Sequence, residues 1–466
     1  MSRSSTSILV AIAVAVSSIA LLQNLVIPLV PLVQAEFGVT ADAASWTMTA
    51  WLIAAAVATP TLGRIGDLRG RRTTFLITLG VTALGDVLAA VAPSLTMLIV
   101  ARVLQGIGGA LFPLAYGLLR DALPRERVTG AIGVVSAVIG IGGAAGTVLA
   151  GPIADLVGWR GTFAIPFLVA MIGAFLTVAV VRDSGTRAHG RVNTRSSLLL
   201  SAWLVALLVP LSAGARWGWT APATLAFFGV AVLAFTAWIL SELRSAEPLV
   251  DLRLMTSPAI WPANAASLLI GAGVFAFWGY LPQFLELSPS AGGTGLSVRD
   301  AGLVLVPMLI GMSGIGFAAG ALSRIVSLRT MLATGSVLMG VSAASAALAH
   351  TAPWQLAIAG AGFGIGCGLA YAASASIVVQ GVPAAVTGVA TGVNANLRTI
   401  GSAIGSAATG AIVFGAAPHG SAPGFAKAWG LVAVCTLVAG AIVWAVRTRP
   451  SDGTATTTLP ELVDAV

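Results

Sequence analysis

Three ionisable side chains, Asp86, Arg102 and Arg398, stand well inside long apolar stretches of the sequence. A charge near the centre of a bilayer costs about 2.5–3.5 kcal/mol on insertion scales, so each is a candidate functional residue. Asp86 precedes a short turn by about eight residues and Arg102 follows it by about seven, which at about 1.5 Å per residue gives them a similar depth in neighbouring helices. We therefore expect these two side chains to lie close enough to pair, directly or through water.

Such a pair can carry proton chemistry, because burial favours the neutral carboxyl and a nearby guanidinium favours the charged one. Our hypothesis is that Asp86 responds to protons and that Arg102 is its partner. The alternative is a structural ion pair that never changes protonation. Asp155 and Glu286 lie near predicted span ends and are more simply interpreted as interface charges. Arg398 could hold an anionic substrate or donate to backbone carbonyls where glycine-rich helices cross, and we prefer the second interpretation.

The composition indicates a polytopic membrane protein. Hydrophobic residues make up 57% of the 466 residues and charged residues only 9%, whereas soluble domains carry about 25% charged residues. The net charge of +8 comes from arginines spread through short loops, so it indicates orientation in a membrane rather than nucleic-acid binding. The two cysteines, Cys367 and Cys435, lie in apolar runs and are too few for a metal site, so they are expected to be packing residues.

Apolar runs long enough to cross a bilayer, which takes about 17–25 residues, recur along the chain. The first exceeds the apolar part of a signal peptide, about 7–15 residues, so we predict that it stays as the first span. With both termini in the cytoplasm, 18 of the 24 Lys+Arg residues fall in cytoplasmic segments and four in outer loops, the bias of a correct topology. The fourteen predicted spans are 8–33, 45–62, 74–93, 96–119, 128–151, 161–181, 198–215, 222–241, 259–285, 300–323, 329–349, 354–380, 386–416 and 425–447.

The most strongly charged stretch, residues 63–72, holds four arginines and one acid between two predicted spans. A loop so short and basic is expected to stay on the cytoplasmic side. The stretch resembles the signature of cytoplasmic loop 2–3 in the major facilitator superfamily. The matching residues are Gly63, Asp67, Gly70, Arg71 and Arg72, while Leu68 stands where the family usually has a base.

Further segments resemble the fourteen-span drug:proton antiporter branch of that family. They are residues 102–109, which match Arg-x-x-Gln-Gly-x-Gly, and residues 214–219, 242–253 and 396–401. The resemblance covers essentially the whole chain and implies an all-α major facilitator fold, with two six-helix bundles, two inserted transmembrane helices and both termini cytoplasmic. It predicts an N-terminal bundle at 1–181, a linker with the inserted spans at 182–258, a C-terminal bundle at 259–449 and a disordered tail at 450–466.

The resemblance also implies which residues gate the conformational change. They are the five matching residues of loop 63–72, together with Gly146 and Gly151, which align with a span-five signature whose proline is replaced here by Thr147. Many relatives carry an acid in span one, where this chain has Leu22 beside the neutral Gln23 and Asn24. We therefore assign the role of the membrane acid to Asp86.

A substrate cavity between the two bundles should draw on polar and aromatic residues, because aromatic rings bind apolar or cationic organic molecules by stacking and cation–π contacts. Trp46 and Trp51 could belong to it or could be interfacial anchors. The candidate substrate-binding residues are Gln23, Asn24, Gln105, Tyr116, Asn264, Trp278, Tyr280, Gln283, Tyr371, Asn394 and Arg398.

These expectations combine into a secondary active transporter that exports amphipathic drugs or secondary metabolites by alternating access, coupled to protons. We expect a monomer in the cell's inner (cytoplasmic) membrane that meets a small amphipathic substrate, protons and the lipid bilayer, without a cofactor, a metal or nucleic acid. The alternative is a carrier of a lipid or an anionic metabolite, with or without proton coupling. A channel or a membrane-embedded enzyme is less favoured, because the sequence shows no filter-like loop and no catalytic set at membrane depth.

Overall fold

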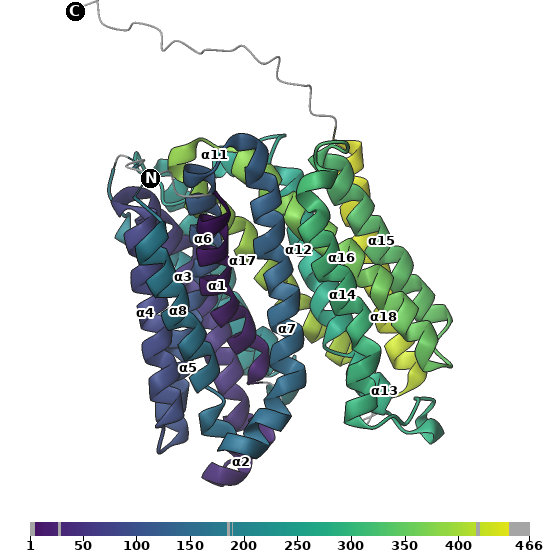
Figure 1. Ribbon diagram of the computed structural model, residues 1–466. Helices are drawn as coiled ribbons and strands as arrows, with labels where there is room; N and C mark the ends of the chain where they lie inside the picture. Colours follow the sequence, from purple (N-terminus) through teal and green to yellow (C-terminus); the bar gives the residue numbers. More distant parts are fainter. Residues whose placement is uncertain (1–4, 27–28, 184–186, 189, 416–419, 447–466) are drawn as a thin grey trace, which may run out of the picture.

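The computed structural model describes residues 5–26, 29–183, 187–188, 190–415 and 420–446. Helices are the only regular elements in these ranges, which confirms the all-α prediction. Inside a membrane this is expected, since a helix satisfies its backbone hydrogen bonds within one segment. Figure 1 shows that α1 begins and α18 ends at the same end of the molecule, called here the upper end.

The long helices are α1 (Ser5–Leu25), α3 (Ala41–Arg69), α4 (Arg71–Ala90), α5 (Leu95–Ile107), α6 (Leu111–Ala122), α7 (Arg125–Gly161), α8 (Ala164–Val180), α9 (Thr194–Trp217), α10 (Pro222–Arg244), α12 (Trp261–Trp278), α14 (Val298–Leu322), α15 (Leu328–Leu348), α16 (Pro353–Gly381), α17 (Thr387–Phe414) and α18 (Ala422–Ala445). The short ones are α2 (Val30–Phe37), η2 (Gly108–Ala110), α11 (Leu252–Met255), α13 (Leu281–Glu286), η3 (Pro289–Ala291) and η4 (Ala384–Val386).

Thirteen helical segments of the described chain are long and apolar enough to cross a membrane. The count rises to fourteen if Ala150–Gly161 and Ala164–Val180, which meet at 82°, form one further span. The fourteen spans predicted from the sequence agree with the upper count. Some of the predicted runs are divided between helices: 8–33 passes from α1 into α2, 96–119 from α5 through η2 into α6, and 259–285 from α12 into α13 at Gly279.

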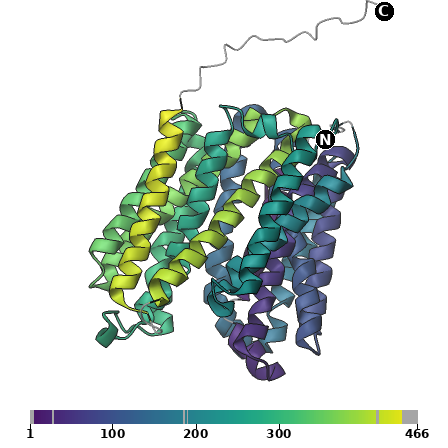
Figure 2. The ribbon, with the colours of Figure 1, turned by 180° about the vertical axis from the view of Figure 1, so that it is seen from behind.

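Buried apolar side chains form two clusters. The first contains residues between Ala11 and Val181 with Ala375 and Val379, and the second contains residues from Leu200 onward with Ala56. In the first half α1 packs on α7 and α8, and α5 packs on α3 and α4. In the second half α16 packs on α14 and α15, and α12 on α17 and α18. Figures 1 and 2 show the two groups of helices side by side. The predicted division into segments 1–181, 182–258, 259–449 and 450–466 stays a prediction.

The halves meet along two lines, α7 against α14 and α3 against α17. The inserted hairpin of α9 and α10 lies beside the second line, because α9 packs on both α3 and α17. Small residues make these approaches close. A Cβ added at Gly133 of α7 would collide with the Gly316 carbonyl of α14, and one added at Gly63 of α3 would lie 2.8 Å from the Gly388 carbonyl carbon. Membrane helices associate through such small-residue contacts.

The crossing of α12 and α17 leaves no room for a side chain at Gly401. A Cβ at Gly401 would collide with the Leu268 carbonyl, so Gly401→Ala should destabilise the protein by about 1–3 kcal/mol, the usual cost of overpacking. Thermal unfolding in detergent would show a lower midpoint. Gly314→Ala is the matched control, because an added Cβ there meets nothing within 4 Å. Equal midpoints for the two variants would contradict the close crossing.

Candidate functional site

Two cavities lie between the halves, in the lower part of the molecule. Their volumes are about 260 Å³ and about 280 Å³. They adjoin, because Gln23, Trp51, Leu52, Phe275 and Ser402 line both. The first is also lined by Ile19, Ala55, Thr59, Gly109, Phe112, Ile139, Val274, Trp278, Gly279, Pro282, Leu305, Met312, Tyr371, Ala395, Arg398 and Thr399.

The inserted hairpin closes one side of the second cavity. Leu211 and Ser212 of α9 and Trp219 of the turn after it lie on its wall, and the Ser212 and Thr49 hydroxyls are 2.6 Å apart. The remaining wall comes from Met48, Thr49, Tyr280, Ala403, Ser406, Ala407 and Gly410. A mostly apolar space with a few polar groups is typical of a site for small organic molecules.

Arg398 brings the only charge among the residues that line these two cavities. Its backbone lies at the crossing with α12, where the Ser402 hydroxyl donates to the Gly271 carbonyl at 3.1 Å. Its guanidinium carbon lies 4.4 Å from the centre of the Tyr371 ring. The expected bonds from the guanidinium to backbone carbonyls are not found among the described residues. The glycine-rich crossing therefore uses the backbone of Arg398, while its side chain reaches the cavity.

A second polar cluster lies outside the cavity walls, where α3, α4 and α5 meet. The Gln105 amide nitrogen donates to Asp86 Oδ1 at 2.9 Å, and Arg102 Nη1 donates to Gln105 Oε1 at 2.8 Å. Arg102 Nε donates to the Thr47 carbonyl at 3.0 Å. The acid and the base therefore meet through an amide side chain instead of directly. Asp86 Oδ2 and Arg102 Nη2 are buried without a hydrogen-bond partner.

Local sequence explains this assembly. Ser94 caps α5, and its hydroxyl accepts from the Met97 N–H at 3.3 Å, which fixes the tight turn between α4 and α5. Gly85 lets the two helices approach, since a Cβ there would lie 2.8 Å from Gln105 Cγ. Arg102 and Gln105 share a face because they are three residues apart on a helix. The guanidinium of Arg102 also lies 5.8 Å from the ring of Trp51, which lines both cavities.

The upper end is closed by a buried network centred on Asp67. Its two carboxylate oxygens accept from the Gly388 N–H at 3.0 Å and the Val389 N–H at 2.9 Å, in the first turn of α17. Its Oδ1 also pairs with Arg71 Nη2 at 2.6 Å, and Arg71 pairs with Asp121 at 2.7 Å. An anion at a helix N-terminus is favourable, because free N–H groups and the helix dipole point at it. The carboxylate thus joins the two halves.

The other predicted gating residues have different surroundings. Gly70 has φ +113 and connects α3 to α4, a backbone conformation that glycine adopts at little cost. Arg72 Nη2 donates to the Val178 carbonyl of α8 at 3.1 Å. Gly146 is buried in α7, whereas Gly151 has nothing within 4 Å of an added Cβ, so α7 is not closely packed there.

The predicted substrate residues divide into three groups. Gln23, Trp278, Tyr280, Tyr371 and Arg398 line the cavities. Buried away from both cavities are Gln105, Tyr116, Asn264 and Asn394, while Gln283 is exposed and donates to the Gly279 carbonyl. The side chain of Asn24 lies outside the described residues.

Asn264 and Asn394 are buried away from the cavities because they are hydrogen-bonded to each other. The Asn394 amide donates to Asn264 Oδ1 at 3.0 Å and to the Ser267 hydroxyl at 2.9 Å, and the Ser374 hydroxyl joins this network. Buried polar groups in a membrane need such partners.

Asp121, Gly388 and Val389 were not identified from the sequence. The signal for Asp121 was the excess of arginine over acid in residues 63–72, which calls for another carboxylate on that side.

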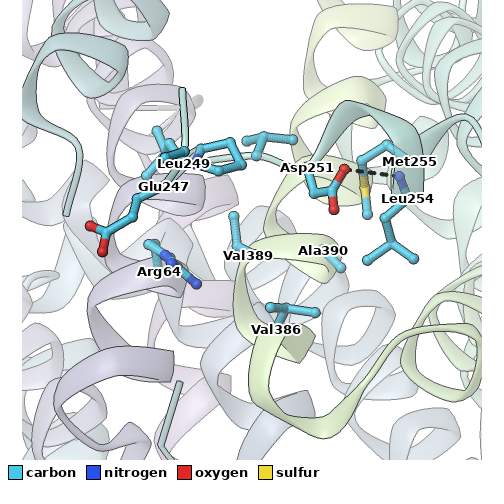
Figure 3. Close-up of a pocket in the computed structure, with 12 residues that line it drawn as sticks. Arg64, Glu247, Leu249, Asp251, Leu254, Met255, Val386, Val389 and Ala390 are labelled. Atoms are coloured by element: carbon cyan, nitrogen blue, oxygen red, sulfur yellow. Dashed lines mark hydrogen bonds between the residues drawn. The ribbon is translucent and has the colours of Figure 1, made fainter. Parts of the chain in front are cut away.

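A third cavity, of about 200 Å³, lies at the upper end between the segment 246–255 and the start of α17. Figure 3 shows Arg64 and Glu247 on one side of it and Asp251 on the other, with Val386, Val389 and Ala390 below. Asp251 caps α11, since its Oδ1 accepts from the Arg253 N–H at 3.0 Å. With charges of both signs on its wall, this cavity indicates no single ligand chemistry.

Comparison with known proteins adds three findings. The family model described as Major Facilitator Superfamily matches residues 12–406. The tetracenomycin C resistance and export protein of Streptomyces glaucescens is 31% identical over 418 residues, covering 87% of this chain and 75% of that protein. The multidrug resistance protein B homolog of Mycobacterium tuberculosis is 29% identical, covering 69% of this chain and 66% of that protein.

Solved structures of low sequence identity have the same fold. The proton:xylose symporter XylE aligns with a TM-score of 0.70 at 13% identity, covering 95% of both chains. The human organic anion transporter MFSD10 aligns with a TM-score of 0.68 at 14% identity, covering 94% of this chain and 99% of that one.

Proposed function

This chain belongs to the Major Facilitator Superfamily and is a multi-pass membrane transporter of small organic molecules, not an enzyme, and on that premise we propose that it exports amphipathic organic compounds in exchange for protons. The observation that carries the proposal is the pair of adjoining, largely apolar cavities between the two halves, together with the buried polar network of Asp67 that bonds the halves at their upper end. In such a fold the substrate site alternates between the two sides as one half rocks against the other.

The direction of transport and the class of compound are supported by the relatives. One is named for the resistance to and export of tetracenomycin C, and another for multidrug resistance. We place the protein as a monomer in the cell's inner membrane with its upper end in the cytoplasm, because the basic stretch at residues 63–72 lies there. The cytoplasmic side is then closed, and the cavities extend toward the outer ends of α9, α12 and α17.

Proton coupling is assigned to the cluster of Asp86, Gln105 and Arg102. Asp86 is 1% exposed and has one carboxylate oxygen without a partner, which is where a proton would reside. Arg102 connects the cluster to the cavity through the ring of Trp51. A change in occupancy or wetting of the cavity can therefore change the relative stability of the charged and neutral carboxyl.

The test is transport by purified protein in proteoliposomes. With an imposed pH gradient, added tetracenomycin C should drive proton movement, reported by a trapped pH-sensitive dye, and nigericin should abolish accumulation of the compound. Movement of the compound that ignores the gradient would contradict proton coupling and favour the uncoupled carrier. A steady ion current without any added compound would indicate a channel.

A further inference from the structure

The walls of the two cavities carry an unbalanced positive charge. Arg398 lines the first cavity, and none of the residues that line either cavity is Asp or Glu. Two buried carboxylates of the first half have partners of their own outside the cavity walls: Asp86 accepts from Gln105, and Asp67 accepts from Gly388 in the upper network. A cationic compound would therefore enter this space without a counter-charge.

The guanidinium of Arg398 is available to a ligand. Among the described residues it has neither an ion pair nor a hydrogen bond, and its guanidinium carbon lies 4.4 Å from the centre of the Tyr371 ring. Stacking on an aromatic ring leaves the N–H groups at the edge of the guanidinium free to donate. Leaving a partly buried charge unpaired is unfavourable, so a ligand that supplies an anion would be stabilised here.

The surroundings define what carries the anion. Trp51, Phe112, Phe275, Trp278 and Tyr371 line the first cavity around Arg398. Such rings bind planar aromatic surfaces by offset or edge-to-face stacking. The planar fork of a guanidinium matches a carboxylate and can hold it with two parallel hydrogen bonds. A single guanidinium surrounded by aromatic rings is therefore suited to binding an aromatic acid.

We propose that the cavities select aromatic amphiphiles with an acidic group, a carboxylate or an ionised phenol, that Arg398 binds this group, and that lipophilic cations are rejected. This inference rests on the proposed function as an exporter and names the charge of its substrate. It has an electrical consequence. Exchange of one proton for one anion moves two positive charges inward per cycle, whereas exchange of a proton for a monovalent cation moves none.

Two dyes that share the xanthene ring system provide the experiment. Fluorescein is an acid with a carboxylate and a phenolate, and rhodamine 123 is a cation. In proteoliposomes with a pH gradient we expect fluorescein to be transported at least about tenfold faster than rhodamine 123, since like charges at close range cost several kcal/mol. An inside-negative potassium diffusion potential, set with valinomycin, should accelerate export of fluorescein from vesicles in which the protein has its native orientation.

Variants at Arg398 test the residue itself. Arg398→Gln should lower fluorescein transport by about 10–100-fold, the loss expected for a charge-assisted hydrogen bond, and Arg398→Lys should restore part of it. Arg398→Glu should reverse the preference toward rhodamine 123. Arg299→Gln is the matched control, because it removes the same charge from an exposed position outside both cavities. Fluorescence polarisation in detergent would measure fluorescein binding independently of transport.

The outcomes separate this inference from the proposed function. Equal transport of both dyes, or unchanged fluorescein binding and transport in Arg398→Gln, would overturn the inference. If neither dye moves while tetracenomycin C still exchanges for protons, charge is not what the cavities select, and the inference fails although the exporter function stands. If no compound exchanges for protons, the proposed function fails as well.

Discussion

Asp86→Asn is expected to abolish the response of export to a pH gradient while leaving a folded protein that still exchanges substrate. Asparagine has the size of aspartate, and its side-chain oxygen can still accept from Gln105, so the contact between α4 and α5 is kept. The substituted group can no longer release or bind a proton. We expect gradient-driven transport to fall by about 5- to 150-fold, the range that typical coupling free energies give.

The measurement compares two modes in one preparation. Gradient-driven accumulation should fall to the rate seen without a gradient, whereas counterflow exchange at equal pH should persist. Asp155→Asn is the matched control, since it makes the same chemical change at an exposed acid near the outer end of α7. Full gradient dependence in Asp86→Asn would remove Asp86 from the coupling mechanism, and the structural role of the cluster would then be the better interpretation.

The position of this cluster could be predicted from the sequence because helix rise is regular. Counting from the turn near Pro93 gave Asp86 and Arg102 the same depth, and the structure has them at opposite ends of one amide side chain. The bridging role of Gln105 could not be predicted. A glutamine in this position can face a cavity or a neighbouring helix, and the choice depends on Gly85, whose missing Cβ lets α4 approach.

Contacts between residues of the two halves could not be predicted from the sequence for a different reason. Asp67 and Gly388 are 321 positions apart, so no local pattern relates them. The loop signature indicated that Asp67 matters, but its partner is a pair of backbone N–H groups, which every residue except proline has. Likewise, Asn264 and Asn394 were assigned to the cavity because they are polar residues within predicted spans. The structure shows that they are partners of each other.

Asp67→Asn is expected to open the upper end. Asp67 is 0% exposed and neutralises the first turn of α17 and the guanidinium of Arg71 together. An amide has one oxygen and one donor nitrogen, so it cannot accept from Gly388, Val389 and Arg71 at once, and its nitrogen would face other donors. Breaking a buried ion pair in this way costs about 3–5 kcal/mol. Because the lost contacts join the halves, the cost falls mainly on the closed arrangement.

Distances between spin labels would show the change directly. Arg69→Cys and Ile325→Cys place labels at exposed positions on the upper ends of the two halves, in a background with Cys435→Ala. Asp67→Asn should shift the distribution to longer distances and lower gradient-driven transport by at least about tenfold, because 1.4 kcal/mol already changes a population tenfold. Asp183→Asn is the control, since Asp183 pairs only loosely with Arg187 at 3.7 Å and is 37% exposed in its side chain.

The same variant tests whether the gate and the cavity communicate. α17 begins at the network of Asp67 and carries Arg398 near its middle, where it lines the cavity. A helix that is released at its first turn can move as a unit, so opening at the upper end should alter the position of Arg398. We expect Asp67→Asn to change fluorescein affinity in detergent, although Asp67 is not among the residues that line either cavity. An unchanged affinity together with a widened label distance would mean that α17 bends between the two sites, and that closure and substrate binding are independent.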